Sequence, residues 1–179
     1  RRLGLRWRTH PESPEPPDLA GVDILVVTSR VRVDARALEG FSGSLVLTTT
    51  SGWDHIDVAA AVAKGVVVAR SPRARRDAVV EQAIYGLSSL LRRQPALDEA
   101  ARDGRWARAD LPLLDPMTLR DAEILVVGLG VIGRRTAEVL QAMGARVLGV
   151  DPAGVPEGVE AVSLEGGLRR AAGVTLHCA

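Results

Sequence analysis

The sequence has 179 residues, of which 46% are hydrophobic and 25% are charged, an ordinary composition for a soluble globular protein. The formal net charge of +1 and the lack of an apolar run of the roughly 20 residues that a membrane span needs argue against a nucleic-acid or membrane partner. Cys178 is the single cysteine, which excludes an internal disulfide and favours a reducing, cytoplasmic location.

The first half of the chain alternates strand and helix patterns. Its expected elements are strands at 3–7, 22–28, 45–48 and 66–69, a Pro- and Glu-rich loop at 10–17, and helices at 34–39 and 58–64. Asp57 is placed to N-cap the second helix, and Gly65 to end it. This alternation predicts a parallel sheet with helices on its faces.

The middle and the end of the chain continue with helical and strand patterns. Asp77 is placed to cap a long helix, because apolar residues recur at helical spacing after it. The expected elements are helices at 78–93 and 95–102, a loop at 104–118, a short strand at 160–162, a helix from Ser163 to about 172, and a strand at 174–178.

The most informative stretch runs from Glu123 to Asp151. A short apolar, β-branched run at 124–127 predicts a buried parallel strand. The letters GLGVIG follow at 128–133 and fit the pattern G-x-G-x-x-G, ahead of a helical pattern that Gly144 ends. A second strand at 146–150 then leads to Asp151, which completes a β-α-β unit.

Each feature of this unit suits a dinucleotide. Gly128 permits the tight turn, Gly130 allows a pyrophosphate to approach the backbone, and Gly133 lets helix and strand pack closely. The helix N-terminus offers N–H groups to phosphates. Asp151 can accept both ribose hydroxyls of NAD and would repel the 2′-phosphate of NADP.

A G-x-G-x-x-G pattern alone is weak, because a Gly-rich turn between strand and helix can also lack a ligand. Here strand, helix, second strand and terminal aspartate all fall in register, so the sequence predicts an NAD site. No set of residues with metal-ligand spacing stands out, and no metal is expected.

Five motifs in order, over nearly the whole chain, resemble those of the D-isomer-specific 2-hydroxyacid dehydrogenases. Residues 48–57, TTTSGWDHID, resemble the family's T-x-G-x-D-x-I-D loop. The others are Ser71-Pro72 with Val79-Val80-Glu81 (P…V-A-E), Gly104-Arg105-Trp106 (G-x-W), Thr118-Leu119 ahead of the glycine pattern (T-L…G-x-G-x-I-G), and Leu176-His177-Cys178 (L-H-x-P).

The resemblance implies an α/β fold with two Rossmann-like lobes, both incomplete as given. Residues 1–90 would be part of the substrate lobe, and residues 91–179 a truncated NAD-binding lobe that carries the glycine pattern. The implied reaction is reversible hydride transfer between NAD(H) and a 2-keto or 2-hydroxy acid. The resemblance also implies a homodimer formed through the nucleotide lobe.

Site residues carry over by their positions in these motifs. The pyrophosphate would be bound by Gly128, Gly130, Val131, Ile132 and Gly133, and the adenosine ribose by Asp151. Cys178 would line the adenine pocket, and Val79 would pack near the nicotinamide. Thr50, Ser51 and Gly52 would bind the substrate carboxylate, with Ser51 also near the nicotinamide.

The family's catalytic arginine, acid and histidine follow the L-H-x-P strand, so no residue in this sequence matches them and the chain is expected to be incomplete at its C-terminus. The residues that could stand in have simpler interpretations. His55 and His177 are expected to be structural, and one of Arg73, Arg75 and Arg76 could hold an anionic substrate if the loop is not merely solvated. The alternative to an oxidoreductase is a truncated or degenerate member that binds NAD or a partner without catalysis.

Overall fold

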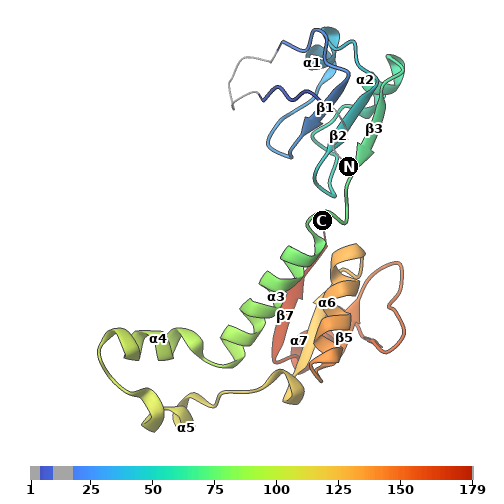
Figure 1. Cartoon of the computed structure of the whole chain (residues 1–179). Helices are drawn as coiled ribbons and strands as arrows, with labels where there is room; N and C mark the ends of the chain where they lie inside the picture. Colours follow the sequence, from blue (N-terminus) through green and yellow to red (C-terminus); the bar gives the residue numbers. More distant parts are fainter. Residues whose placement is uncertain (1–4, 10–17, 179) are drawn as a thin grey trace. The chain divides into compact units, whose positions relative to one another are not determined.

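The computed structural model describes residues 5–9 and 18–178 (Figure 1). The chain divides into two compact units, Arg1–Ala74 and Arg75–Ala179. Residues 5–9 form no strand, so the described part of the expected strand at 3–7 is wrong. Residues 3 and 4 and the expected loop at 10–17 lie outside the described residues.

The first unit is a three-stranded parallel sheet with the order β1-β2-β3 (Figure 1). Its strands are β1 (Ile24–Val27), β2 (Leu45–Thr48) and β3 (Val67–Arg70), and its crossover helices are α1 (Ala35–Glu39) and α2 (Val58–Ala63). These elements confirm the expected alternation. Asp57 caps α2 as predicted, because its Oδ1 accepts a hydrogen bond from the N–H of Ala60 at 2.9 Å.

The second unit is a four-stranded parallel sheet with the order β6-β5-β4-β7. Its strands are β4 (Glu123–Val127), β5 (Arg146–Val150), β6 (Glu160–Ala161) and β7 (Gly173–Leu176). Its helices are α3 (Arg76–Leu91), α4 (Gln94–Arg102), α5 (Leu111–Leu114), α6 (Val131–Ala142) and α7 (Leu164–Arg170), with 3₁₀ turns η1 (Ala107–Ala109) and η2 (Leu119–Asp121). The β-α-β unit expected at 123–151 is therefore confirmed as β4-α6-β5.

The core of this unit lies between the sheet and its helices. Ile124, Leu125 and Val126 of β4 are fully buried, as expected for the inner strand of a parallel sheet covered on both faces. Leu87 and Leu91 of α3 belong to the same buried cluster. Because α3 packs on this core, the structural boundary falls after Ala74 and not near residue 90. The substrate and NAD-binding roles assigned to the two parts remain predictions.

Two local predictions are wrong. Asp77 does not cap α3, since Arg75 holds the N-cap position and Asp77 instead forms an ion pair with Arg76 at 2.9 Å. The segment expected as a loop at 104–118 contains η1 and α5. Pro112 does not prevent α5, because it lies in the first turn, where a missing N–H breaks no helical hydrogen bond.

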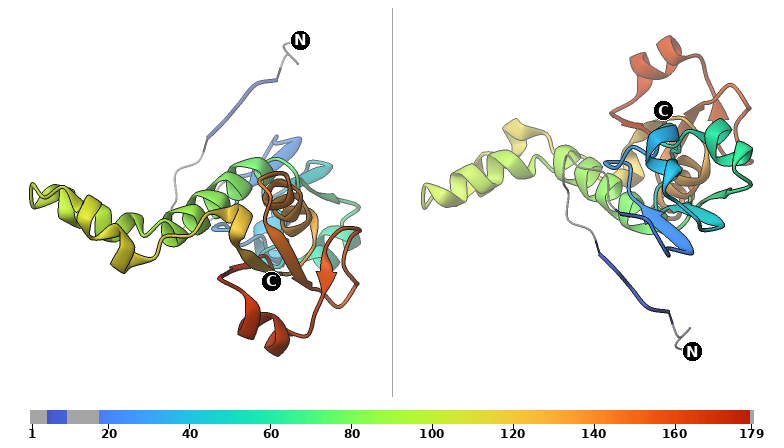
Figure 2. Two further views of the ribbon diagram at one scale, coloured as in Figure 1. Left: turned by 90° about the horizontal axis from the view of Figure 1, so that it is seen from below. Right: turned by 90° about the horizontal axis from the view of Figure 1, so that it is seen from above.

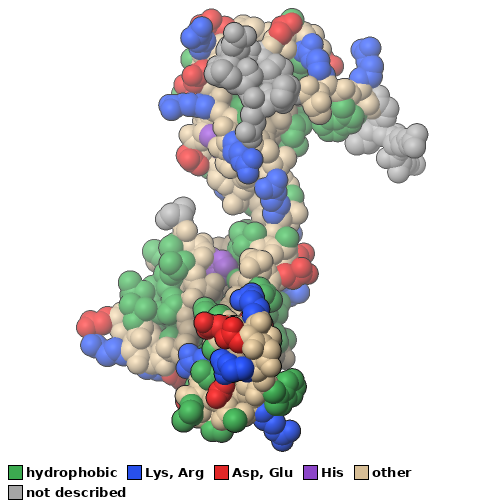
Figure 3. Space-filling model, turned by 90° about the vertical axis from the view of Figure 1, so that its left-hand side faces the viewer, with side chains coloured by type: hydrophobic (Ala, Val, Ile, Leu, Met, Phe, Trp, Pro, Cys, Tyr) green, Lys and Arg blue, Asp and Glu red, His purple; other side chains and the backbone are tan. Residues whose placement is uncertain are grey.

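Residues 94–115, named here the α4–α5 arm, extend away from the sheet of the second unit, as the views in Figure 2 show. Trp106 and Leu113 on this arm are each 87% exposed. Figure 3 shows hydrophobic side chains on the surface of the second unit, between charged ones. The arm thus presents large apolar side chains to solvent.

Candidate functional site

The turn from β4 to α6 requires glycine at its first position. Gly128 has a φ of +87°, which side chains rarely adopt. A Cβ there would also lie 2.6 Å from the backbone nitrogen of Cys178 and 2.7 Å from the carbonyl carbon of His177. The end of β7 therefore packs directly against the glycine turn.

Gly133 is required by helix packing. A Cβ at this position in the first turn of α6 would lie 1.9 Å from the carbonyl oxygen of Gly128. The helix N-terminus can approach the strand end this closely because residue 133 has no side chain. The packing role predicted for Gly133 from the sequence agrees with this geometry.

Gly130 is different, because nothing in the described structure demands a glycine there. Its φ of −70° suits any residue, and a Cβ would meet no atom within 4 Å. The missing side chain leaves open space beside the N-terminus of α6, where the described residues provide no side-chain cap. The first N–H groups of a helix lack intrahelical acceptors, so this space suits a phosphate.

Asp151, at the end of β5, holds the glycine turn through its carboxylate. Oδ2 accepts a hydrogen bond from the N–H of Leu129 at 2.6 Å, and Oδ1 accepts one from the N–H of Ala153 at 2.8 Å. These two bonds, Leu129 first, lower the pKa of the Asp151 carboxyl against the opposing effect of desolvation. The lowered pKa favours the ionised carboxylate, in which both oxygens are hydrogen-bond acceptors.

Leu129 is fixed from three directions. Its carbonyl accepts a hydrogen bond from Nε of Arg134 at 2.7 Å, while its N–H is held by Asp151. Its side chain is 1% exposed, and a Cβ on Gly149 would lie 2.8 Å from its Cδ1. The middle residue of the G-x-G turn is therefore an anchor, and the turn is organised before any ligand binds.

The other residues predicted at the nucleotide site lie where the motifs place them on this unit. Val131 is exposed and Ile132 half-buried in the first turn of α6, and Cys178 is exposed just after β7. Val79, on the first turns of α3, is 39% exposed. Their contacts with a cofactor remain predictions.

The predicted substrate loop, residues 50–52, belongs to the first unit and follows β2. The carbonyl of Ser51 accepts a hydrogen bond from Nη1 of Arg70 at 3.0 Å, and that of Gly52 accepts one from Oγ1 of Thr50 at 3.0 Å. Within the described part of the chain, the N–H groups of Ser51 and Gly52 donate to no protein acceptor. Such a loop can offer two N–H groups to an anion.

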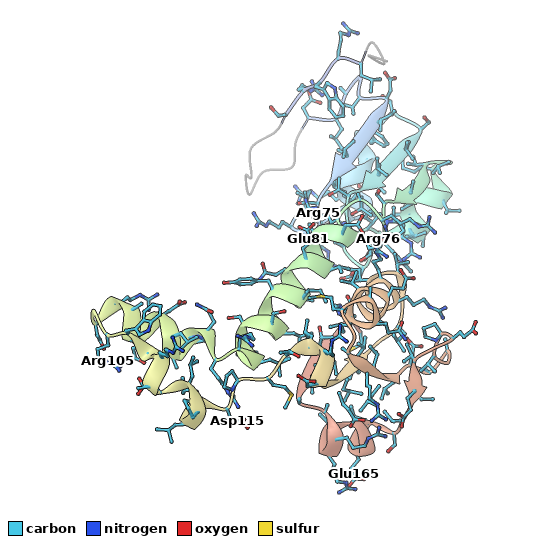
Figure 4. The ribbon with its side chains drawn as sticks, turned by 60° about the horizontal axis from the view of Figure 1, so that its bottom comes forward. Arg75, Arg76, Glu81, Arg105, Asp115 and Glu165 are labelled. Atoms are coloured by element: carbon cyan, nitrogen blue, oxygen red, sulfur yellow. The ribbon has the colours of Figure 1, made fainter. Side chains whose placement is uncertain are left out.

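Arg73, Arg75 and Arg76, one of which could hold an anionic substrate, differ in their surroundings. Arg76 pairs with Asp77, and its hydrogen bond lowers the pKa of that carboxyl. Arg75 and Arg76 stand at the start of α3 with Glu81 on a following turn (Figure 4). Arg73 and Arg75 are exposed. An anion-binding role for one of these arginines remains a prediction.

His177 is engaged in the structure of its own strand end. Its Nε2 lies 3.1 Å from Oγ1 of Thr175, and its N–H donates to the carbonyl of Val127 at 2.8 Å. Partial burial lowers the pKa of its imidazole. This arrangement agrees with the structural role expected for His177.

Two residues of these sites were not predicted from the sequence. Arg134 and Arg70 each reach a loop carbonyl with a long flexible side chain, and no spacing rule indicates such a contact. The burial of Leu129 could have been predicted from the sequence, because an apolar residue between two glycines of a turn is expected to be buried.

Comparison with known proteins gives a family assignment. Residues 84–179, more than half of the chain, match the family described as D-isomer specific 2-hydroxyacid dehydrogenase, NAD binding domain. The chain belongs to this family. It therefore carries the NAD-binding domain of the D-2-hydroxyacid dehydrogenases.

Similar proteins extend the likeness beyond the matched domain. The chain is 32% identical over 185 residues to D-3-phosphoglycerate dehydrogenase of Mycobacterium bovis, and the match covers 98% of this chain and 34% of that protein. The chain thus spans about a third of the length of this curated relative.

Two solved structures agree with the fold. A protein of Thermus thermophilus has a TM-score of 0.78 and 29% identity, over 89% of this chain and 52% of that one. D-lactate dehydrogenase of Aquifex aeolicus, complexed with NAD and lactic acid, has a TM-score of 0.75 and 22% identity, over 89% of this chain and 49% of that one. The Rossmann-type α/β architecture predicted from the sequence is thereby confirmed.

The described residues form neither a membrane-spanning helix nor a cluster of metal-ligating side chains. No helix there has the length and apolar character to cross a membrane. Within 5–9 and 18–178, no three His, Cys, Asp or Glu side chains come together as a group that could hold a metal ion.

Proposed function

We propose that this chain is part of an NAD-dependent oxidoreductase that acts on the CH–OH group of a D-2-hydroxy acid. The observation that carries the proposal is the space at Gly130. Packing does not require glycine there, and the open position lies at the N-terminus of α6, which has no side-chain cap. The residue before it, Leu129, donates its N–H to the carboxylate of Asp151. A pyrophosphate and its adenosine ribose need these two partners, the helix N-terminus and the carboxylate.

Each group has a defined task in this proposal. The N–H groups at the start of α6, from Gly130 to Gly133, bind the pyrophosphate, with Val131 and Ile132 beside it. Each carboxylate oxygen of Asp151 accepts one backbone hydrogen bond. Each therefore keeps a lone pair that can accept a hydrogen bond from a ribose hydroxyl. When bound, NAD accepts or delivers the hydride, and the protein supplies orientation and charge.

The first unit is proposed to hold the substrate. The N–H groups of Ser51 and Gly52 bind the carboxylate of the 2-keto or 2-hydroxy acid, because within the described residues they donate to no protein acceptor. Arg70 and Thr50 hold the carbonyls of these two residues and so restrain the loop. In the second unit, Val79 is proposed to border the nicotinamide and Cys178 the adenine. The first unit then acts as the substrate lobe and the second as the NAD-binding lobe.

The proposal requires further catalytic groups, because nothing in these 179 residues matches the family's arginine, acid and histidine. A polypeptide of these residues alone is therefore expected to bind NAD without turnover. The second candidate is a family member that binds NAD or a partner without catalysis.

One assay separates the two candidates. The product of the complete reading frame is mixed with NADH and with glyoxylate, pyruvate or hydroxypyruvate, and the fall in NADH absorbance is followed. Turnover with one of these acids supports the oxidoreductase. NAD binding without turnover of any 2-keto acid in a broader panel would support the non-catalytic candidate instead.

We also propose that the protein is a homodimer formed through the second unit. Trp106 and Leu113 on the α4–α5 arm are strongly exposed, and α3 and α6 border a cavity of about 400 Å³. Its lining residues are Asp77, Val80, Glu81, Ile84, Tyr85, Arg135 and Val139. In the proposed dimer, Trp106 and Leu113 would be covered by the partner subunit.

Light scattering after size exclusion tests the dimer. Wild type is expected at twice the chain mass, and Trp106→Ala is expected to shift the protein toward monomer. Trp53→Ala, which removes an exposed tryptophan from the first unit, serves as the control. A monomeric wild type at high concentration would refute the proposal.

A cytoplasmic location is proposed from the composition. Cys178 is an exposed free thiol, and such a group suits a reducing compartment. Recovery of the native protein in the cytoplasmic fraction of its source cells, with Cys178 reduced, is the expected result. Recovery in an oxidising compartment would overturn it.

A further inference from the structure

Four groups form a connected line of hydrogen bonds beneath the substrate loop of the first unit. Nε2 of His55 lies 3.1 Å from Oγ1 of Thr48, which lies 2.8 Å from Oγ1 of Thr50. Oγ1 of Thr50 in turn donates to the carbonyl of Gly52 at 3.0 Å. Thr48 is fully buried, so its hydroxyl cannot exchange these partners for bulk water.

Counting protons gives the line a direction. Thr50 has one hydroxyl proton, which goes to the Gly52 carbonyl, so its oxygen must accept from Thr48. Thr48 then has no proton left to give, so its oxygen must accept from His55. The ring of His55 therefore carries its proton on Nε2.

The other ring nitrogen provides an independent check. Nδ1 of His55 is buried and has no hydrogen-bond partner among the described residues. With the proton on Nε2, Nδ1 is a bare acceptor. The opposite direction would place an N–H at Nδ1 with nothing to receive it, and buried unpaired N–H groups are the rarer defect in proteins.

The backbone of His55 is equally well fixed. Its carbonyl accepts a hydrogen bond from the N–H of Val33 at 2.8 Å, and the N–H of Asp57 donates to the carbonyl of Val33 at 2.8 Å. Val33 itself is 1% exposed in the core of the unit. The imidazole thus extends from a firmly held backbone toward Thr48.

We infer that His55, protonated on Nε2, is a positioning residue that fixes the Gly52 peptide of the substrate loop through Thr48 and Thr50. The inference rests on the substrate role proposed for residues 50–52. Arg70 holds the neighbouring Ser51 carbonyl in the same way. The Ser51 carbonyl shares its peptide plane with the N–H of Gly52, so Arg70 orients that N–H, while the line from His55 fixes the other side of Gly52. Within the described residues neither Ser51 nor Gly52 donates its N–H to a protein acceptor, so both can bind the carboxylate of a 2-keto or 2-hydroxy acid.

The tautomer is measurable without any ligand. Long-range ¹H–¹⁵N spectra of the labelled chain at mildly alkaline pH distinguish a protonated from a bare ring nitrogen. The expected result is a protonated Nε2 and a bare Nδ1 for His55. A protonated Nδ1 would overturn the inference, whatever the function of the loop.

Two neighbouring threonines offer a matched pair of variants. Thr48→Val removes the hydroxyl in the middle of the line, whereas Thr49→Val removes a buried hydroxyl that has no described partner. Oxalate is titrated as the carboxylate probe, and the amide shifts of Ser51 and Gly52 are followed. Thr48→Val should weaken oxalate binding about tenfold, and Thr49→Val should leave it unchanged.

Substitutions of His55 separate hydrogen bonding from packing. His55→Gln retains a side-chain N–H donor and should preserve most of the oxalate affinity, whereas His55→Leu retains bulk and should lose about as much as Thr48→Val. Equal affinity in His55→Leu and wild type would overturn the positioning role. No oxalate-induced shift in wild type, with the Nε2 tautomer present, would instead reject the substrate role of the loop.

Discussion

The carboxylate of Asp151 ties the end of β5 to the glycine turn that precedes α6, because its Oδ2 accepts the backbone N–H of Leu129 at 2.6 Å. The residue proposed to bind the ribose is therefore also part of the structure of the proposed phosphate loop. Arg134 completes this arrangement by donating to the carbonyl of the same leucine. In the proposed site, one side chain would thus bind the ribose and hold the loop.

Asp151→Asn is predicted to do more damage than a change of one charge. An asparagine presents one oxygen and one NH₂ group, so either Leu129 or Ala153 would face a donor in place of an acceptor. We expect NAD affinity to fall at least about tenfold and the thermal midpoint to drop. Asp110→Asn, which alters an exposed ion pair with Arg105, is the control. An unchanged thermal midpoint in Asp151→Asn would contradict the structural role.

Gly130 and Gly133 are predicted to respond oppositely to a side chain. Gly133→Ala places a Cβ 1.9 Å from the Gly128 carbonyl oxygen, so the backbone must shift, at a cost of about 2 kcal/mol or more. The Cβ of Gly130→Val meets no atom within 4 Å, and we expect the free energy of unfolding to stay nearly unchanged. Urea denaturation measures both. Similar losses in the two variants would show that Gly130 also serves packing.

A charged cluster at the amino ends of the strands is predicted to stabilise the second unit. Arg170 pairs with Glu123 of β4 at 2.9 Å and also with Glu160 of β6. Arg170→Met should lower the urea midpoint. Arg169→Met should change it less, because that arginine makes a single ion pair with Glu165 on the exposed side of α7 (Figure 4). Equal shifts of the urea midpoint in the two variants would mean that the cluster stabilises the fold no more than an isolated ion pair does.

The same cluster predicts a pH dependence. Hydrogen bonds from Arg170 lower the pKa of the Glu123 and Glu160 carboxyls in the folded chain. The unfolded chain then binds protons more readily, so this stabilisation is complete above the ordinary glutamate value of about 4.5 and is lost as the pH falls through the lowered folded pKa. Urea midpoints measured from about pH 6 to pH 3 should fall more steeply in wild type than in Arg170→Met. Parallel curves would contradict the assignment.

The parts of the fold with strong periodicity and special residues were predictable. The β4-α6-β5 unit has an apolar strand, three glycines at fixed spacing and a terminal aspartate. Each of these features can be recognised from a few neighbouring residues in the sequence. The boundary after Ala74 was not predictable, since it depends on Leu87 and Leu91 packing into a distant core. The same holds for Arg134 and Arg70, whose contacts depend on the path of a flexible side chain.

The most direct test of the account is a calorimetric titration of NAD and NADP into the wild-type chain and into Gly130→Val. The account predicts that wild type binds NAD, binds NADP more than about tenfold more weakly because the 2′-phosphate meets the ionised Asp151, and that Gly130→Val stays folded but binds neither. Equal affinity of wild type for the two dinucleotides, or unchanged NAD binding by Gly130→Val, would contradict it.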